Sequence, residues 1–229
     1  MEIVIKSLIE GARQADGLVV IVDVFRAFTT ASVAFSRNAK KIYLVAEIDE
    51  ALKLRDDGVV DICMGEVDGI RPQEFDYGNS PYEISTANVD GKVIAQSTRA
   101  GTVGATSVNL DNQIYVCSFP ILTATANSII SRSPNLVTIV AMGDRGLIRT
   151  DEDEICALSL RNRLQGREVD SDGISSVILS SDHAQKFDDK NLPHYPPMDR
   201  DMALNVDSYD FAISVSRQEG LLVAEPESL

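Results

Sequence analysis

The stretch Val19–Thr30 reads VVIVDVFRAFTT and joins a continuous apolar run directly to a turn with charged and hydroxyl side chains. An apolar, β-branched run of this kind is typical of a strand that is buried on both faces of a parallel sheet. Side chains just past the carboxyl end of such a strand face the crevice where open α/β proteins bind ligands, and the next helix offers N–H groups to anions. Asp23 and Arg26 are therefore candidate site residues. The alternative is that Asp23 only caps the helix and Arg26 only pairs with a surface carboxylate.

The rest of the chain alternates short β-rich runs with longer segments of helix-compatible spacing, which is typical of βαβ crossovers. We predict an α/β fold, formed by a single domain over residues 1–229, in which helices cover both faces of a mostly parallel sheet. Arg217–Gly220 separates the last two strands, and we expect these to form an antiparallel hairpin at one edge of the sheet. The predicted strands are Leu18–Val22, Ile42–Val45, Asp61–Met64, Lys92–Ala95, Ile114–Cys117, Val137–Ala141, Phe211–Val215 and Leu221–Ala224. The predicted helices are Ala27–Asn38, Asp49–Asp56, Gly101–Leu110, Leu122–Ser131 and Glu152–Leu164.

Composition limits the possible partners. The 229 residues carry a formal net charge of −14, and their 21 basic residues are scattered, which argues against a nucleic-acid or anionic-membrane surface. A local basic pocket for a small anion is still compatible with an acidic chain. The three cysteines, Cys63, Cys117 and Cys156, lie far apart among apolar neighbours, and we expect them to be reduced core residues of a cytoplasmic protein. We expect neither a signal peptide nor a membrane span.

Gln96–Thr102, which reads QSTRAGT, closes a predicted strand with hydroxyls, an arginine and a glycine. Glycine at Gly101 would allow a ligand to approach the backbone, and the helix that follows would supply N–H donors to a phosphate. Arg99 could add a bidentate clamp. The pattern G-x-x-x-x-G-K-[ST] is absent, so this is not a P-loop nucleotide site. A phosphatase of the haloacid dehalogenase type would need a second acid two residues after Asp23, where the chain has Phe25.

Four motifs, taken in order and spacing, resemble the 2-phosphosulfolactate phosphatase family over roughly the whole chain. They are VDVFRAFTT at Val22–Thr30, GEVDGIRPQEFDYGNSP at Gly65–Pro81, STRAGT at Ser97–Thr102 and DEDEICA at Asp151–Ala157. The resemblance implies a magnesium-dependent enzyme of the kind that acts in coenzyme M biosynthesis in methanogens and has many bacterial relatives. The chain departs from the family at Ser97–Thr102, where the best-known members carry a Thr-Thr-Asn-Gly-Thr type of sequence. Arg99 therefore replaces or supplements a neutral amide.

The resemblance also implies roles for individual residues. Mg²⁺ takes hard oxygen ligands and keeps several waters, so a few carboxylates would suffice to hold it. We predict Asp23, Glu66 and Asp153 as metal ligands, with Asp76 in reserve. The alternative for Asp153 is that the acids of this segment only favour the positive end of a helix. The predicted catalytic residues are Asp23, Arg26, Glu66, Asn79 and Ser80, and the predicted substrate-binding residues are Thr98, Arg99, Gly101 and Thr102.

We therefore expect a Mg²⁺-dependent hydrolase of a small acidic phosphomonoester, 2-phosphosulfolactate or a close analogue, that acts as a homodimer. Two alternatives are open: a non-catalytic anion-binding or regulatory protein, and a lyase or transferase that acts on a phosphorylated acid. The segment Asp182–Arg200 has three prolines, both histidines and few aliphatic residues. We expect it to form an irregular flap and not a second domain.

Overall fold

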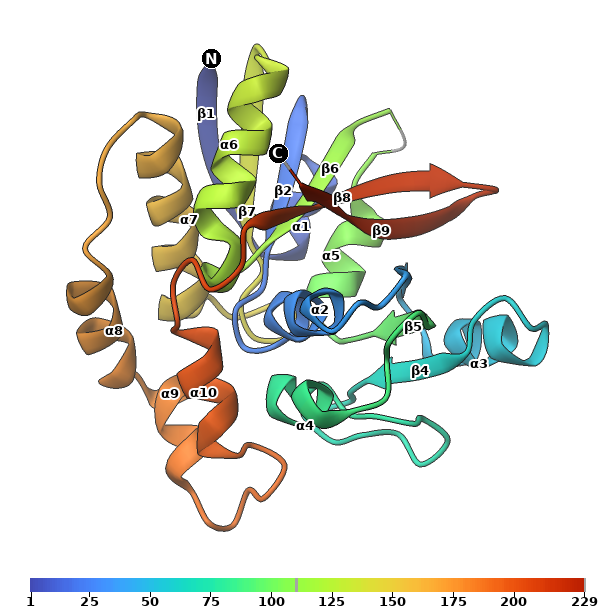
Figure 1. Ribbon diagram of the computed structural model, residues 1–229. Helices are drawn as coiled ribbons and strands as arrows, with labels where there is room; N and C mark the ends of the chain where they lie inside the picture. The colour runs from blue at the N-terminus through green and yellow to red at the C-terminus, as the bar shows by residue number, and fades with distance from the viewer. Residues whose placement is uncertain (110, 229) are drawn as a thin grey trace.

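The structure is a computed structural model that describes residues 1–109 and 111–228, and a twisted nine-stranded sheet runs through it (Figure 1). The order of the strands across the sheet is β1-β7-β2-β6-β8-β9-β3-β5-β4. The strands are β1 (Glu2–Ser7), β2 (Leu18–Val22), β3 (Lys41–Val45), β4 (Ile62–Gly65), β5 (Val93–Ser97), β6 (Gln113–Cys117), β7 (Leu136–Ala141), β8 (Phe211–Gln218) and β9 (Leu221–Ser228). All eight predicted strands are present within one or a few residues of the expected bounds.

The sheet consists of two parallel blocks joined by an antiparallel hairpin. One block is β1-β7-β2-β6 and the other is β3-β5-β4. The hairpin β8-β9 is antiparallel, as predicted, but it lies between the blocks, because β8 pairs with β6 and β9 pairs with β3. The prediction that the hairpin lies at an edge of the sheet is therefore wrong. The sequence of a turn and its two flanking strands can predict a hairpin. It does not predict which other strands will pair with that hairpin in the sheet.

Helices cover both faces of the sheet, as the sequence predicted. They are α1 (Leu8–Arg13), α2 (Ala27–Ser36), α3 (Ile48–Asp56), α4 (Pro81–Thr86), α5 (Gly101–Ser107), α6 (Leu122–Arg132), α7 (Asp151–Leu164), α8 (Ser171–Leu179), α9 (Asp182–Gln185) and α10 (Pro197–Ala203), with 3₁₀ turns at Phe119–Ile121 and Lys186–Asp188. Leu110, the last residue of the predicted helix Gly101–Leu110, lies outside the described residues. Strand β1 and helices α1, α4, α8, α9 and α10 were not predicted. Strand β1 mixes apolar with charged residues and lies at a sheet edge, so its pattern is weak.

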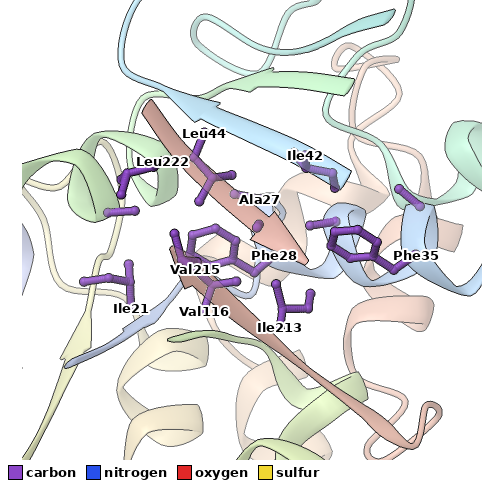
Figure 2. Close-up of a cluster of buried hydrophobic side chains, with 14 of the residues drawn as sticks. Ile21, Ala27, Phe28, Phe35, Ile42, Leu44, Val116, Ile213, Val215 and Leu222 are labelled. Atoms are coloured by element: carbon purple, nitrogen blue, oxygen red, sulfur yellow. The ribbon is translucent and has the colours of Figure 1, made fainter. Parts of the chain in front are cut away.

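Strand β2 shows how the core is divided between the two faces. Its five residues are all buried, and Val19 and Ile21 pack into one hydrophobic cluster while Leu18, Val20 and Val22 pack into another. The first cluster joins the two parallel blocks, since side chains of β2, β3, β6 and the hairpin all contact it around Phe28 of α2 (Figure 2). Because burial of apolar side chains is favourable, this cluster fixes α2, and with it the turn that precedes α2, against both blocks.

The three cysteines lie in the core, as predicted. All three cysteines are buried, and each is free of any disulfide. No helix within residues 1–109 and 111–228 is long and apolar enough to cross a membrane.

Candidate active site

A polar cavity of about 110 Å³ lies where the turns after β2, β4, β5 and β7 meet the segment that we call the flap, residues 182–200. Charged side chains dominate its wall, with four acids and four bases. The lining residues are Asp23, Phe25, Arg26, Glu66, Asp68, Gly69, Asn79, Arg99, Ala100, Gly143, Asp144, Arg145, Lys186 and Tyr195. Five of the predicted site residues, Asp23, Arg26, Glu66, Asn79 and Arg99, are thus brought together.

Asp23 is the most deeply buried acid of the cavity wall, with 5% of its surface exposed. Its Oδ1 accepts a hydrogen bond from the backbone N–H of Ala27 at 3.0 Å, in the first turn of α2. Burial raises the pKa of Asp23 from 3.8 to about 7, against the lowering effect of this hydrogen bond. The nearby charge of Glu66 raises the pKa further. Asp23 therefore binds the first N–H group of α2, although Arg26 is the N-cap residue, and it also lines the cavity.

Gly101 allows α5 to begin directly beside Asp23. A Cβ atom at this position would lie 2.8 Å from Asp23 Oδ2 and 2.8 Å from the Cβ of Ala27. Any larger residue would thus push α5 away from the turn after β2. The backbone of Gly101, at the start of α5, also lowers the pKa of Asp23.

Glu66 connects the loops that follow β4 and β5. Its Oε1 accepts a hydrogen bond from the backbone N–H of Arg99 at 2.8 Å, and its Oε2 accepts one from Gly69 at 2.6 Å. Charge-assisted hydrogen bonds of this kind are about twice as strong as neutral ones. Glu66 therefore fixes the backbone on which Arg99 stands, in addition to adding negative charge to the cavity wall.

Asn79 and Ser80 have different surroundings although they are adjacent in sequence. Asn79 lines the cavity, and its Oδ1 is buried with no hydrogen-bond partner among the described residues. Ser80 caps α4 by accepting a hydrogen bond from the Glu83 backbone at 3.1 Å, and its own hydroxyl donates to Asp199 at 2.6 Å. The structure thus brings Asn79 into the cavity and leaves Ser80 behind it.

Thr98 and Thr102 also lie behind the cavity wall. The hydroxyl of Thr102 accepts a hydrogen bond from the Thr98 backbone at 2.8 Å, and the Thr102 backbone donates to the Thr98 hydroxyl at 3.2 Å. These reciprocal bonds fix the tight turn from β5 into α5. Of the four predicted substrate-binding residues, only Arg99 lines the cavity, where its guanidinium pairs with Glu47 at 3.4 Å.

Asp153 holds two backbone segments together beneath the cavity. Its Oδ1 accepts a hydrogen bond from Val24 at 2.7 Å and its Oδ2 accepts one from Gly143 at 2.8 Å. With both oxygens so occupied, it does not line the cavity. Burial raises its pKa well above 3.8. The reserve residue Asp76 is likewise outside the cavity, where it accepts a hydrogen bond from the Cys63 backbone at 2.8 Å.

The predicted ligand set Asp23, Glu66 and Asp153 is thus divided between the cavity and the layer behind it. Within the described part of the chain, no group of three or more His, Cys, Asp or Glu side chains is arranged to hold a metal ion. Asp23 and Asn79 nevertheless fit a hard cation, because both line the cavity and the amide oxygen of Asn79 is buried without a partner. Mg²⁺ commonly uses only one or two carboxylates, with substrate oxygens and waters completing its shell.

Sequence analysis missed several residues of the cavity wall. Asp144 and Arg145 come from the loop after β7, and Lys186 and Tyr195 come from the flap. Arg145 pairs with Asp68 at 3.0 Å, across from the loop after β4. The flap thus contributes Lys186 and Tyr195 to the cavity wall. The expectation that it is irregular is wrong, since α9, a 3₁₀ turn and the start of α10 occupy much of it. These helices are only one or two turns long, too short for a periodic apolar pattern.

The raised pKa of Asp23 predicts how stability depends on pH. In the metal-free protein, the folded state retains a proton between about pH 4 and about pH 7 that an unfolded chain has released. The contribution of Asp23 to stability is therefore present at low pH and is lost as the pH rises through this window. We expect the melting temperature of the wild type, relative to Asp23→Asn, to fall between pH 5 and pH 8. If the difference in melting temperature between the wild type and Asp23→Asn stays constant over this range, the carboxyl group of Asp23 has an ordinary pKa.

Comparison with known proteins places the chain in a family. The model of the 2-phosphosulpholactate phosphatase family matches residues 3–194. The probable 2-phosphosulfolactate phosphatase of Bacillus subtilis (strain 168) is 30% identical over 204 residues, which cover 88% of this chain and 87% of the relative. The corresponding protein of Pseudothermotoga lettingae is 33% identical over 181 residues, or 73% and 77% of the two chains. The corresponding protein of Thermoplasma acidophilum is 32% identical over 151 residues, which cover 66% of this chain and 67% of the relative.

The match to the family model covers the turns after β2, β4, β5 and β7, so it includes most of the cavity wall. It also agrees with the motif resemblance, which was drawn from four separate segments of the chain. The chain therefore belongs to the 2-phosphosulpholactate phosphatase family, whose members are phosphoric monoester hydrolases.

Proposed function

We propose that this protein hydrolyses a small acidic phosphomonoester, 2-phosphosulfolactate or a close analogue, and that it requires Mg²⁺. The observation that carries the proposal is the position of Asp23, a buried carboxyl group in a cavity that also holds four cationic side chains and the unpaired amide oxygen of Asn79. Family membership supports a phosphomonoester as the substrate, and the names of the relatives support 2-phosphosulfolactate in particular.

The balance of charge in the cavity supports a metal ion. The four bases of the wall are matched by four acids, and Arg26 is neutralised further by Asp199 behind it. A phosphomonoester with a carboxylate and a sulfonate would bring several negative charges into a space with no net positive charge. Asp23 and Asn79 would hold Mg²⁺, which would neutralise charge on the phosphoryl group as the transition state forms.

The cations of the wall have separate positions from which to bind the substrate. Arg99 and Arg145 belong to the loops after β5 and β7, and Lys186 belongs to the 3₁₀ turn of the flap. Their acidic partners lie 3.0 to 3.9 Å away at partly exposed positions. Such exposed pairs contribute roughly 0–1 kcal/mol, so an anionic substrate can replace the acid at little cost. In the net reaction, the ester P–O bond breaks, phosphorus gains the oxygen of one water, and a proton of that water goes to the departing alcohol.

A phosphate-release assay over a panel of small phosphoesters, each measured with Mg²⁺ and with EDTA, tests this function. We expect release that depends on Mg²⁺ and is fastest for esters that carry a second anionic group. Release that is unaffected by EDTA would contradict the metal requirement. A protein that binds these esters but releases no phosphate from any of them would contradict the phosphatase assignment.

We also propose that the protein is a cytoplasmic homodimer. Its three unpaired, buried cysteines are consistent with a reducing compartment.

The loop after β7 exposes Leu147 and Ile148, which are 68% and 61% accessible, beside the cavity. Exposed apolar side chains of this kind are common at subunit contacts. Light scattering at micromolar concentration should return twice the chain mass of 24.9 kDa. A single-chain mass would contradict the dimer.

A further inference from the structure

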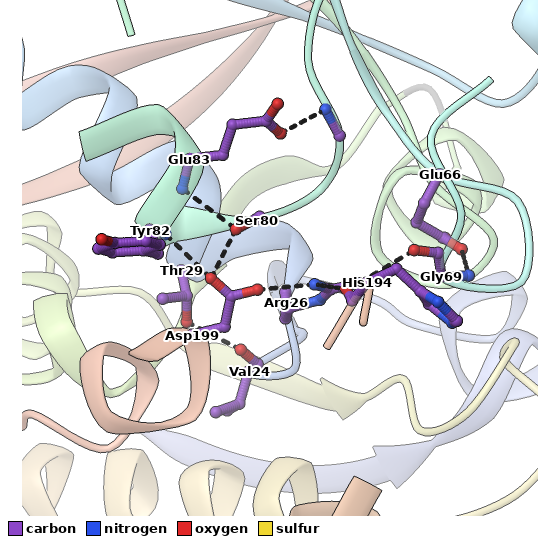
Figure 3. Close-up of polar contacts among 11 residues, drawn as sticks. Val24, Arg26, Thr29, Glu66, Gly69, Ser80, Tyr82, Glu83, His194 and Asp199 are labelled. Atoms are coloured by element: carbon purple, nitrogen blue, oxygen red, sulfur yellow. Dashed lines mark hydrogen bonds and ion pairs between the residues drawn. The ribbon is translucent and has the colours of Figure 1, made fainter. Parts of the chain in front are cut away.

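Asp199, on helix α10 of the flap, is a fully buried acid that does not line the cavity. Its Oδ2 accepts a hydrogen bond from Arg26 Nη1 at 2.7 Å, and its Oδ1 accepts hydrogen bonds from the Ser80 hydroxyl at 2.6 Å and the Tyr82 backbone at 3.0 Å (Figure 3). These partners lie 173, 119 and 117 residues away in sequence. One carboxylate therefore joins the flap to the turn after β2 and to the start of α4.

Arg26 is held on every side in the same way. Besides its ion pair with Asp199, Nη1 donates a hydrogen bond to the carbonyl of His194 at 2.8 Å, and Nη2 donates one to the carbonyl of Gly69 at 3.3 Å. The ring of Tyr195 lies 4.5 Å from the guanidinium carbon. Gly69 is required at its position, because a Cβ there would lie 2.2 Å from the hydroxyl of Tyr195. The guanidinium thus has a single, fixed orientation in the cavity wall.

A buried charge without a partner is costly, and a guanidinium is fixed by partners that match its planar geometry. Carbonyls and an aromatic ring alone leave the charge of Arg26 uncompensated, so the carboxylate of Asp199 is the group that retains it in the wall. Because Asp199 itself faces away from the cavity, any effect that it has on a substrate must pass through Arg26 or through the position of the flap.

We propose that Asp199 is a positioning residue that fixes the guanidinium of Arg26 in the cavity wall and docks the flap over the site. The first half of this proposal rests on the proposed phosphatase function, and the second half does not. Asp199 also lies beyond residue 194, the last residue that the family model matches, so the family match alone does not point to it.

A double-mutant cycle on kcat/KM for phosphate release tests the first half. Asp199→Asn keeps the size of the side chain but removes its charge, and we expect a loss on the order of 10²-fold from misplacement of Arg26. Arg26→Ala should lose at least as much. If Asp199 acts through Arg26, the double variant should have the kcat/KM of Arg26→Ala within about twofold. Losses that multiply would show that Asp199 affects turnover independently of Arg26 and would overturn the first half of the proposal.

Asp201→Asn is the matched control, since Asp201 stands two residues further along the same helix and its side chain is 56% exposed. It should retain the wild-type kcat/KM, and an equal loss in both variants would contradict a specific role for Asp199. Should Asp199→Asn fail to fold, Ser80→Ala provides the same cycle, because it removes one hydrogen bond from Asp199 and leaves the ion pair intact. Its smaller loss should likewise vanish in the Arg26→Ala background, and a loss that persists would overturn the first half of the proposal.

Hydrogen exchange of the flap separates this proposal from the proposed function, because it requires no turnover. In Asp199→Asn, amides of residues 182–200 should exchange on the order of tenfold faster or more, while those of β2 keep their wild-type rates. Unchanged exchange in the flap would overturn the docking role. A wild type that releases no phosphate, together with the expected exchange, would instead overturn the proposed function alone.

Discussion

Replacing Asp23 by Asn should lower kcat on the order of 10³-fold or more while leaving the protein folded. Asp23 is the acid in the deepest part of the cavity, and in our proposal it is the carboxylate that holds the metal ion beside Asn79. The amide of an asparagine keeps the shape of the side chain and can still accept the Ala27 hydrogen bond. It cannot supply the negative charge that a hard cation requires.

The same substitution should not cost stability. Burial raises the pKa of Asp23 to about 7, so the ionised form is unfavourable in the folded protein, and a neutral amide removes that penalty. We expect the melting temperature of Asp23→Asn at pH 8, without metal, to equal or exceed that of the wild type. Mg²⁺ should raise the melting temperature of the wild type and leave that of the variant unchanged. Asp90→Asn, at an exposed turn position, is the control. Full activity in Asp23→Asn would refute the assignment.

Replacing Arg99 by Ala should reveal what this chain does differently from its relatives. Arg99 adds a positive charge at the cavity wall. Its partner Glu47 has a side chain that is 63% exposed, so it competes only weakly with an anionic substrate for Arg99. We expect Arg99 to bind the second anionic group of the substrate, since the motif resemblance implies a neutral residue at the corresponding place in the family and the cavity wall offers the phosphate other cations. Loss of a hydrogen bond to a charged group costs about 1.5–3 kcal/mol, which corresponds to a KM increase of roughly 10- to 150-fold.

The substrate dependence of that loss is the critical result. The rise in KM should appear with esters that carry a carboxylate or sulfonate and be absent with p-nitrophenyl phosphate. Arg37→Ala, at an exposed position after α2, should leave both substrates unaffected. A fall in kcat/KM of on the order of 10²-fold for both kinds of substrate would show that Arg99 grips the transferred phosphate instead.

The features that the sequence could predict are those with local signals. The run before Asp23 identified a central strand and the position of a ligand site at its end, because strand burial and the alternation of strands with helices are both encoded locally. The structure places Glu66, Asn79 and Arg99, from the motifs at Gly65–Pro81 and Ser97–Thr102, in the same cavity wall as Asp23, while their predicted roles stay predictions. The motif resemblance predicted the family, and the match to the family model confirms it.

The remaining features depend on contacts between distant segments. Nothing near Arg26 in sequence indicates that its partner is Asp199, and nothing near Asp153 indicates that two backbone N–H groups already occupy its oxygens. A surface carboxylate was the expected partner of Arg26 in the simpler alternative, whereas the actual partner is buried. Lys186 and Tyr195 were missed because the short helices of the flap carry no periodic pattern, and only the tertiary fold places them at the cavity.

The most direct measurement follows 2-phosphosulfolactate by ³¹P NMR and mass spectrometry with wild-type protein and Mg²⁺, and repeats the reaction with Asp23→Asn. Our account predicts that the wild type forms one phosphate and one sulfolactate for each ester consumed, and that the variant forms neither at a measurable rate. An unsaturated acid in place of sulfolactate would identify a lyase, and equal product formation by the two proteins would show that the cavity around Asp23 is not the site of hydrolysis.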